Sequence, residues 1–364
     1  MPGNGFLRRA ARPLFQSLSL GAALAASGAL LFLPPAVKRP PAPPVTAAQA
    51  WPKAQRGTVL ADLPDGTAYE PGLFLDAKDS IGTAPSKDGK FLRLLVRHAN
   101  GSLKQLRSLP ISRDPSFESP TVAGDVLVWG EGTTGHEQLW TVNLRDGRPP
   151  RQLTADTGDA RFYESQYDLV LAEGRVHWVA ARSDEVTEVR SVALSGGPVD
   201  VRAEPGMWSL SAWPWLIDGV VAAAGTTTLR NIVTGQDRVI PSTSKSVTGC
   251  SPVWCRVVSL ADDGFTRIEL MHPDGGDRRQ IAQGSAATVI ADVGVLDRFE
   301  VLSDITSTSE LTGNVELLVY EIATHSTVEI SPDAGNVSFR NGVLWWSTGN
   351  QESFLRHSLD LRTV

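Results

Sequence analysis

The chain has 364 residues, with 40 acidic and 34 basic side chains and a formal net charge of -6. This length allows one large domain with appendages, and a mildly acidic chain without a basic stripe excludes a nucleic-acid-binding surface. Its 33 glycines, among scattered aromatic residues and β-branched runs, predict many short strands joined by tight turns.

The amino-terminal segment has the composition of a membrane anchor. Residues 1–13 contain three arginines and no acid, and residues 14–33 contain no charged side chain. A helix of about 20 residues spans one hydrocarbon core, and preceding arginines favour a cytoplasmic N-terminus. We therefore expect a cytoplasmic basic tail over residues 1–13 and a transmembrane helix or uncleaved signal anchor over residues 14–33. The protein would then be single-pass in the cell membrane, with its remainder outside the cytoplasm.

A cleaved signal peptide, which would give a secreted protein, is the alternative. The triplet Ala48-Gln49-Ala50 fits a cleavage site, but it lies 17 residues beyond Leu33. Signal peptides have apolar segments of about 7–15 residues with the cleavage site close behind, so we favour the anchor. A mature N-terminus at Trp51 would establish cleavage. Residues 34–56 contain a proline-rich run that disfavours helix and sheet, and we expect a linker there.

From Gly57 onward, short apolar strands alternate with turns rich in glycine, aspartate, proline and serine. In the clearest unit, a strand over 139–144 is followed by a turn at Asp146-Gly147 and a second strand ending at Thr154. Glycine can take a positive φ in such a turn without steric cost. We identify seven related units, over residues 74–109, 117–154, 165–203, 213–241, 252–282, 288–330 and 336–361.

The spacing of these units predicts a β-propeller. Residues 57–364 are 308 residues, or 44 for each of seven units, and propeller blades of four strands have about 40–45. No sustained helical period of apolar residues follows Gly57, so an all-β fold is favoured. We expect a propeller over residues 57–364 with seven blades, six or eight being the alternatives. The last unit is one strand short, and we expect Thr58–Ala61 to complete it.

The turn segments resemble those of TolB-like propellers, which carry WD40-like repeats. In that family, a strand leads to a turn of the form D-G-x-x-x-r-x-L-T. Residues 146–154 match this pattern, residues 274–281 match it without the final threonine, and residues 86–90 match the family's S-P-D-G-K with lysine in place of proline. The resemblance implies a β-propeller in an extracytoplasmic setting, here in a membrane-anchored bacterial member, whereas TolB proper is secreted. It does not extend to TolB's partners.

Two groups of residues are candidates for a specific role. Cys250 and Cys255 are the only cysteines, and an even pair outside the cytoplasm predicts a disulfide, with free buried thiols as the alternative. Trp208, Trp213 and Trp215 could form a binding surface, since tryptophan is enriched in contacts, or could pack between blades. We assign no catalytic, cofactor-binding or metal-binding residue, because no local motif for such chemistry is present.

Two functions remain open. The first is a non-enzymatic binding or scaffold propeller, tethered to the membrane through residues 14–33, that presents a face to an envelope protein or glycan and needs no cofactor. The second is a lactonase- or glycosidase-type hydrolase whose site is assembled at the propeller axis from single residues of several blades. A ring of inward acids or histidines at equivalent blade positions would favour the second, and an apolar or open axis would exclude it.

Overall fold

The computed structural model describes residues 44–218, 228–241, 243, 245–261, 264–307, 309–349 and 354–364. Nearly all regular structure in these residues is β-strand, which confirms the expected all-β class. The predicted basic tail and transmembrane helix lie outside the described residues. Within the described ranges, no helix combines the length and the apolar character that crossing a bilayer requires.

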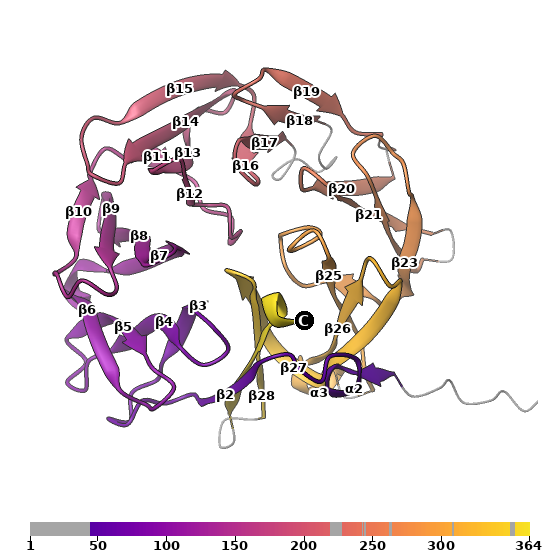
Figure 1. Cartoon of the computed structure of the whole chain (residues 1–364), viewed down its shortest axis with the longest axis horizontal. Helices are drawn as coiled ribbons and strands as arrows, with labels where there is room; N and C mark the ends of the chain where they lie inside the picture. The colour runs from indigo at the N-terminus through magenta and orange to yellow at the C-terminus, as the bar shows by residue number, and fades with distance from the viewer. Residues whose placement is uncertain are drawn as a thin grey trace, which may run out of the picture. The chain divides into compact units, whose positions relative to one another are not determined.

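Five sheets each overlap one of the predicted repeats, although four of them begin several residues before it, and they follow one another around a ring (Figure 1). Neighbouring strands within each sheet are antiparallel. The strands are β3 (Glu70–Phe74), β4 (Ser80–Pro85), β5 (Phe91–Arg97) and β6 (Leu103–Pro110) in the first sheet; β7 (Ser116–Ala123), β8 (Val126–Thr133), β9 (His136–Asn143) and β10 (Arg151–Thr154) in the second; β11 (Asp159–Ala160), β12 (Val170–Ala172), β13 (Arg175–Ser183), β14 (Val186–Ala193) and β15 (Asp200–Pro205) in the third; β16 (Trp208–Leu210), β17 (Trp215–Asp218), β18 (Thr228–Asn231) and β19 (Gln236–Val239) in the fourth; and β20 (Ser246–Cys250), β21 (Cys255–Leu260), β22 (Thr266–Met271) and β23 (Arg279–Gly284) in the fifth.

An eight-stranded sheet contains the last two predicted repeats. Its long strand β27 (Ser326–Arg340) has 15 residues and pairs with β26 through its first part and with β28 through its second. The other strands are β1 (Val45–Thr46), β2 (Arg56–Leu60), β24 (Ala287–Thr288), β25 (Phe299–Asp304), β26 (Val315–Glu321), β28 (Val343–Thr348) and β29 (Leu355–Asp360). The described helices are short: α2 (Ala47–Ala50), α3 (Ser309–Thr312) and the 3-10 turns Ile111–Arg113 and Leu361–Thr363.

Strand β2 comes from the start of the domain and completes the sheet formed by its end. Thr58 pairs with His357, and Leu60 pairs with Leu355. The expected completion of the last unit is therefore confirmed, although the strand runs over Arg56–Leu60 rather than Thr58–Ala61. The edge of β29, which would otherwise be free to pair with another chain, is covered by this strand.

The turn that the sequence singles out has the expected conformation. Gly147 has a φ of 70°, and the Asp146 carboxylate accepts a hydrogen bond from the Arg148 backbone N–H at 2.9 Å. The strands on either side pair antiparallel, with Gln152 opposite Trp140. An aspartate that bonds to the backbone two residues on, followed by a glycine at positive φ, explains why this sequence turns here.

Apolar side chains fill the space between successive sheets. Trp129 of the second sheet is fully buried in a cluster with Leu73 of the first sheet, and Trp178 of the third is fully buried against Leu139 of the second. Comparable clusters join the later sheets in turn. Phe74 contacts Trp345 at a centroid distance of 5.3 Å. The apolar contacts thus lead from each sheet to the next, and from the C-terminal strands back to the first sheet.

Part of the predicted linker over residues 34–56 belongs to the folded domain, and residues 34–43 lie outside the described residues. Residues from Pro44 onward belong to the compact unit, and the expectation that no helix or sheet forms there was wrong for 44–56, because β1 and α2 lie in it. Trp51 is 7% exposed and its ring packs edge-on against Phe299 at 5.6 Å. The burial of this large aromatic ring holds the segment around Trp51 against the eight-stranded sheet.

The fit of β2 against its neighbours gives a first prediction. A Cβ at Gly57 would lie 1.9 Å from the Ala77 carbonyl oxygen, whereas at Gly249, also in a strand, the nearest atom would be 3.5 Å away. We expect Gly57→Ala to lower the free energy of unfolding by about 1–3 kcal/mol, because backbone must move to admit the methyl group. Urea unfolding measures the change, and Gly249→Ala is the control, expected to change it by less than about 0.5 kcal/mol. Equal effects of the two substitutions would contradict the close packing of β2.

Candidate functional site

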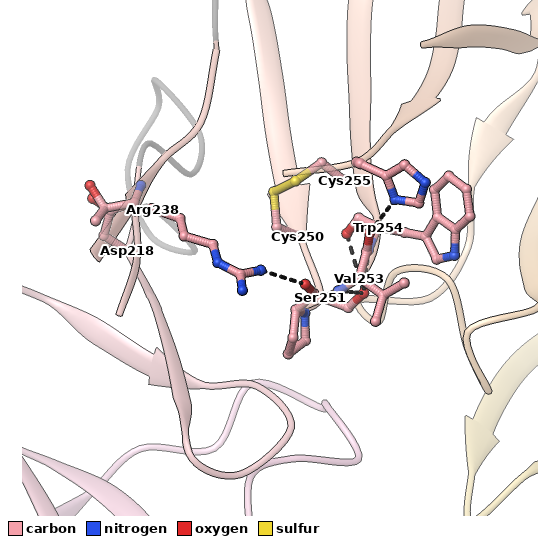
Figure 2. Close-up of a disulfide and its surroundings, with 10 residues drawn as sticks. Asp218, Arg238, Cys250, Ser251, Val253, Trp254 and Cys255 are labelled. Carbon is pink, nitrogen blue, oxygen red and sulfur yellow. Dashed lines mark hydrogen bonds between the residues drawn. A yellow bond between two sulfur atoms is a disulfide. The ribbon is translucent and has the colours of Figure 1, made fainter. Parts of the chain in front are cut away.

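The two cysteines form the predicted disulfide. Cys250 and Cys255 pair in register at the ends of β20 and β21, with an S–S distance of 2.05 Å and Cα atoms 4.0 Å apart (Figure 2). The intervening loop is closed by a hydrogen bond from the Ser251 backbone N–H to the Trp254 carbonyl oxygen at 2.7 Å. The disulfide is therefore a covalent cross-link of one hairpin.

Neighbouring side chains hold this hairpin loop on both sides (Figure 2). Trp254 stacks on His272 with ring centroids 4.1 Å apart, and the His272 ring nitrogen Nδ1 lies 2.9 Å from the Val253 carbonyl oxygen. From the fourth sheet, Arg238 donates to the Pro252 carbonyl oxygen at 3.4 Å. These contacts and the disulfide together fix the position of the hairpin loop.

The three tryptophans lie in packing between sheets. Trp208 is 8% exposed and lies under the Arg230 guanidinium, 4.6 Å from the ring centroid. Trp213 stacks on His177 at 3.6 Å and belongs to the same cluster as Trp208, whereas Trp215 belongs to the next cluster. The structure thus divides them between two sheet junctions, and Trp208 also lines a separate cavity of about 270 Å³.

Two cavities lie among the inner strands of the sheets, and the sequence singled out none of the charged residues that line them. The serine cavity, of about 300 Å³, is lined by segments of the third to fifth sheets and of the eight-stranded sheet, including Ser209, Ser211 and Ser251. The arginine cavity, of about 580 Å³, is lined by segments of the first three sheets and the eight-stranded sheet, including Arg340. Asp292 lines both cavities, which places them side by side.

Two buried aspartates lie at these cavities. Asp168 accepts from the Ser119 hydroxyl at 3.1 Å and from the Tyr163 backbone N–H at 2.8 Å. Asp292 accepts from the Ser165 hydroxyl at 2.6 Å. Burial raises the pKa of Asp168 to about 6, against the hydrogen bonds, which lower it. Burial likewise raises the pKa of Asp292. Both carboxyl groups therefore retain protons more readily than a carboxyl group in water.

Arg340 brings the opposite charge to the same region. Its side chain is 8% exposed at the end of β27, and its pKa is lowered by burial, while Asp168, Asp292 and Glu164 raise it. Its guanidinium donates to the Pro120 carbonyl oxygen over 3.5 Å. The cavities therefore combine a buried cation with buried carboxyl groups, an arrangement suited to binding a polar ligand.

This composition bears on the conditions that the sequence set for an axial hydrolase. Acidic side chains are present, so the cavities are not apolar, but none of the six histidines lines either cavity. Each aspartate is hydrogen-bonded to a serine from a different part of the chain, with sequence separations of 49 and 127 residues. Such pairs leave no local motif. The sequence signal that could have identified a buried aspartate is a single charged residue among apolar ones, as in Val289–Val293.

Comparisons with known proteins support the fold. No protein-family model matches the sequence, and no curated protein is significantly similar to it. A puromycin-hydrolysing peptidase of Mycobacterium tuberculosis has a TM-score of 0.51 at 15% identity, over 86% of this chain and 53% of that protein. An uncharacterised protein of Listeria monocytogenes has a TM-score of 0.51 at 8% identity, over 76% of this chain and 88% of that protein.

TolB structures are also among the similar solved structures. TolB from Acinetobacter baumannii has a TM-score of 0.40 at 9% identity, over 66% of this chain and 60% of that protein. This chain spans about half the length of the mycobacterial peptidase, whose activity belongs to that whole protein. Identities this low establish no shared activity.

The disulfide closes a short loop, which limits its contribution to stability. We expect the double substitution Cys250→Ala and Cys255→Ala to lower the free energy of unfolding by about 2 kcal/mol, because a small loop removes little entropy from the unfolded chain. Urea unfolding with and without dithiothreitol measures this. Reductant should lower the free energy of unfolding of the unsubstituted protein to that of the double variant, and it should leave the free energy of unfolding of the variant unchanged. A reductant effect on the variant would contradict the assignment.

Asp168 makes stability depend on pH in a defined direction. Its pKa is about 6 in the folded protein against 3.8 as the reference value, so between these values the folded state binds more protons than the unfolded state. Stability therefore falls as pH rises through this window. Relative to Asp168→Asn, the unsubstituted protein should lose about 2–3 kcal/mol of unfolding free energy between about pH 4 and pH 7. Urea unfolding of both proteins across this pH range measures the difference in their free energies of unfolding. A difference that does not change with pH would contradict a raised pKa of Asp168.

Proposed function

We propose that residues 57–364 form a closed propeller of seven blades. The five separate sheets supply five blades. The eight-stranded sheet supplies two, because β27 pairs with a different neighbour in each of its two parts. Strand β2 then closes the ring by pairing with β29. The apolar contacts between Phe74 and Trp345 support the same closure.

We further propose that this propeller works outside the cytoplasm, tethered to the cell membrane by residues 14–33. The uncharged run of residues 14–33 after three arginines supports the tether. The Cys250–Cys255 disulfide supports an oxidising compartment, since disulfides persist there and are rare in the cytosol. Secretion after signal cleavage is the alternative, and carbonate extraction of membranes, with and without residues 2–33, distinguishes the two.

In this setting the protein acts as a binding module whose ligand site is the pair of central cavities. One observation carries the proposal: Asp168, Asp292 and Arg340 are each less than 10% exposed and lie at cavities instead of in solid core. Burying charged groups costs free energy, and buried polar residues that converge on a cavity are the usual composition of a ligand site. An envelope protein or a glycan is the partner class that we expect.

Photo-cross-linking in intact source cells tests the binding role. Val247 is 54% exposed and lines the serine cavity, whereas Val239 is 76% exposed on β19 and lines neither cavity. With p-benzoyl-phenylalanine at Val247, we expect a reproducible adduct whose mass separates a protein partner from a small ligand. The same group at Val239 is the matched control. Equal adduct yields at the two positions, or none at Val247, would refute a ligand site at the cavities.

A hydrolase with a central site is the second candidate, and Asp168 favours it. A carboxyl group with a pKa near 6, at a cavity, has the protonation behaviour that general acid–base catalysis uses. Release of nitrophenol from nitrophenyl glycosides and esters, or opening of a simple lactone, tests this candidate. Turnover that is abolished in a folded Asp168→Asn variant would replace the binding proposal with an enzymatic one.

A further inference from the structure

Arg340 has fewer partners than the other arginine buried nearby. Arg256 is 9% exposed, and its guanidinium donates to Glu300 Oε1 at 2.7 Å and to the Asp292 carbonyl oxygen at 3.2 Å. For Arg340, the described part of the chain supplies one acceptor, the Pro120 carbonyl oxygen at 3.5 Å, and no carboxylate oxygen within 4.0 Å. A guanidinium has five N–H donors. Arg340 therefore has donors available for a ligand in the arginine cavity.

Asp292 presents the opposite charge to the same cavity. One carboxylate oxygen accepts from the Ser165 hydroxyl at 2.6 Å, and the other accepts from the Gln166 backbone N–H at 3.2 Å. Because an ionised carboxylate has about four acceptor positions, Asp292 can accept further hydrogen bonds. Burial raises the pKa of Asp292 and lowers that of Arg340, so each charge lacks the solvation that an oppositely charged ligand group would supply.

Apolar side chains form much of the remaining wall of the arginine cavity. They include Phe117, Phe162, Ile290, Phe339 and Trp345. A volume of about 580 Å³ lies within the range of small-molecule sites. The cavity thus offers one buried cation, Arg340, one buried anion, Asp292, and an apolar wall, with the less buried Glu118 and Glu164 also in its lining. A ligand with only a negative charge would be repelled by Asp292, and a ligand with only a positive charge would be repelled by Arg340.

We propose that the arginine cavity binds an α-amino acid with an apolar side chain, with its carboxylate on Arg340 and its ammonium group on Asp292. This inference rests on the proposed binding function and assigns the arginine cavity a small ligand in place of the envelope protein or glycan expected above. The planar guanidinium fork matches the two oxygens of a carboxylate, and the ammonium group donates to the remaining acceptor positions of Asp292. The side chain lies against the aromatic wall.

Three compounds that differ by one charged group test the ligand class on the unsubstituted protein. Isothermal titration calorimetry of the full chain in detergent compares L-phenylalanine with 3-phenylpropionate, which lacks the ammonium group, and with 2-phenylethylamine, which lacks the carboxylate. We expect each analogue to bind at least about tenfold more weakly than L-phenylalanine, because each loses one charge-assisted set of hydrogen bonds. This comparison needs no substitution and so does not depend on a variant's folding.

Substitutions then assign each charge to its residue. Arg340→Gln should weaken the binding of L-phenylalanine at least about tenfold and leave the affinity for 2-phenylethylamine unchanged. Asp292→Asn should weaken the binding of L-phenylalanine and leave the affinity for 3-phenylpropionate unchanged. Arg340→Lys, which keeps the charge but loses the fork, should bind with intermediate affinity. Arg238→Gln, outside both cavities, is the control, and circular dichroism verifies folding.

Equal affinities of the three compounds, or no binding of L-phenylalanine, would overturn the amino-acid ligand class. That result is distinguishable from failure of the binding function, because a specific cross-link at Val247 would still support a ligand of another class. Weakening of all three compounds by both charge substitutions would also overturn the assignment, since it would indicate a general disturbance of the cavity.

Discussion

The structure depends on the antiparallel pairing of β2 with β29, which joins the two ends of the domain. Thr58 and His357 lie opposite each other although 299 residues separate them. Bringing such distant segments together costs chain entropy, and it is offset by backbone hydrogen bonds and by the apolar contacts of Phe74 with Trp345. The last strands therefore contact the first sheet through these apolar side chains and pair with β2 from the start of the domain.

The central cavities follow from this constraint. Three buried charged groups there are each held by a residue of another segment: Asp292 by Ser165, Asp168 by Ser119 and Arg340 by Pro120. If the sheets moved apart, these hydrogen bonds would break and the charges would take up water. A fixed arrangement instead keeps them at low exposure, where an interaction with a ligand is stronger than in water.

The same physical reasoning separates support from function among the aromatic and sulfur-containing residues. Trp208, Trp213 and the disulfide look distinctive in the sequence, yet their contacts fill sheet junctions or close one hairpin. Arg340 looks ordinary, yet it is a buried cation with one long hydrogen bond. An incompletely satisfied buried charge is informative because burial without partners costs free energy that packing does not recover.

The sequence by itself determined the repeats, their turns and the missing strand, because these are local: an aspartate followed by a glycine at positive φ makes the turn at Gly147 wherever it occurs. It also predicted the disulfide from its only two cysteines, with free thiols as the alternative that the structure excluded. Tertiary structure alone decided that Trp51 is core and that residues from Pro44 onward belong to the folded domain, since burial depends on what lies opposite. It alone decided the cavity, because the contacts of Asp168, Asp292 and Arg340 span 49, 127 and 220 residues, and no local pattern records them.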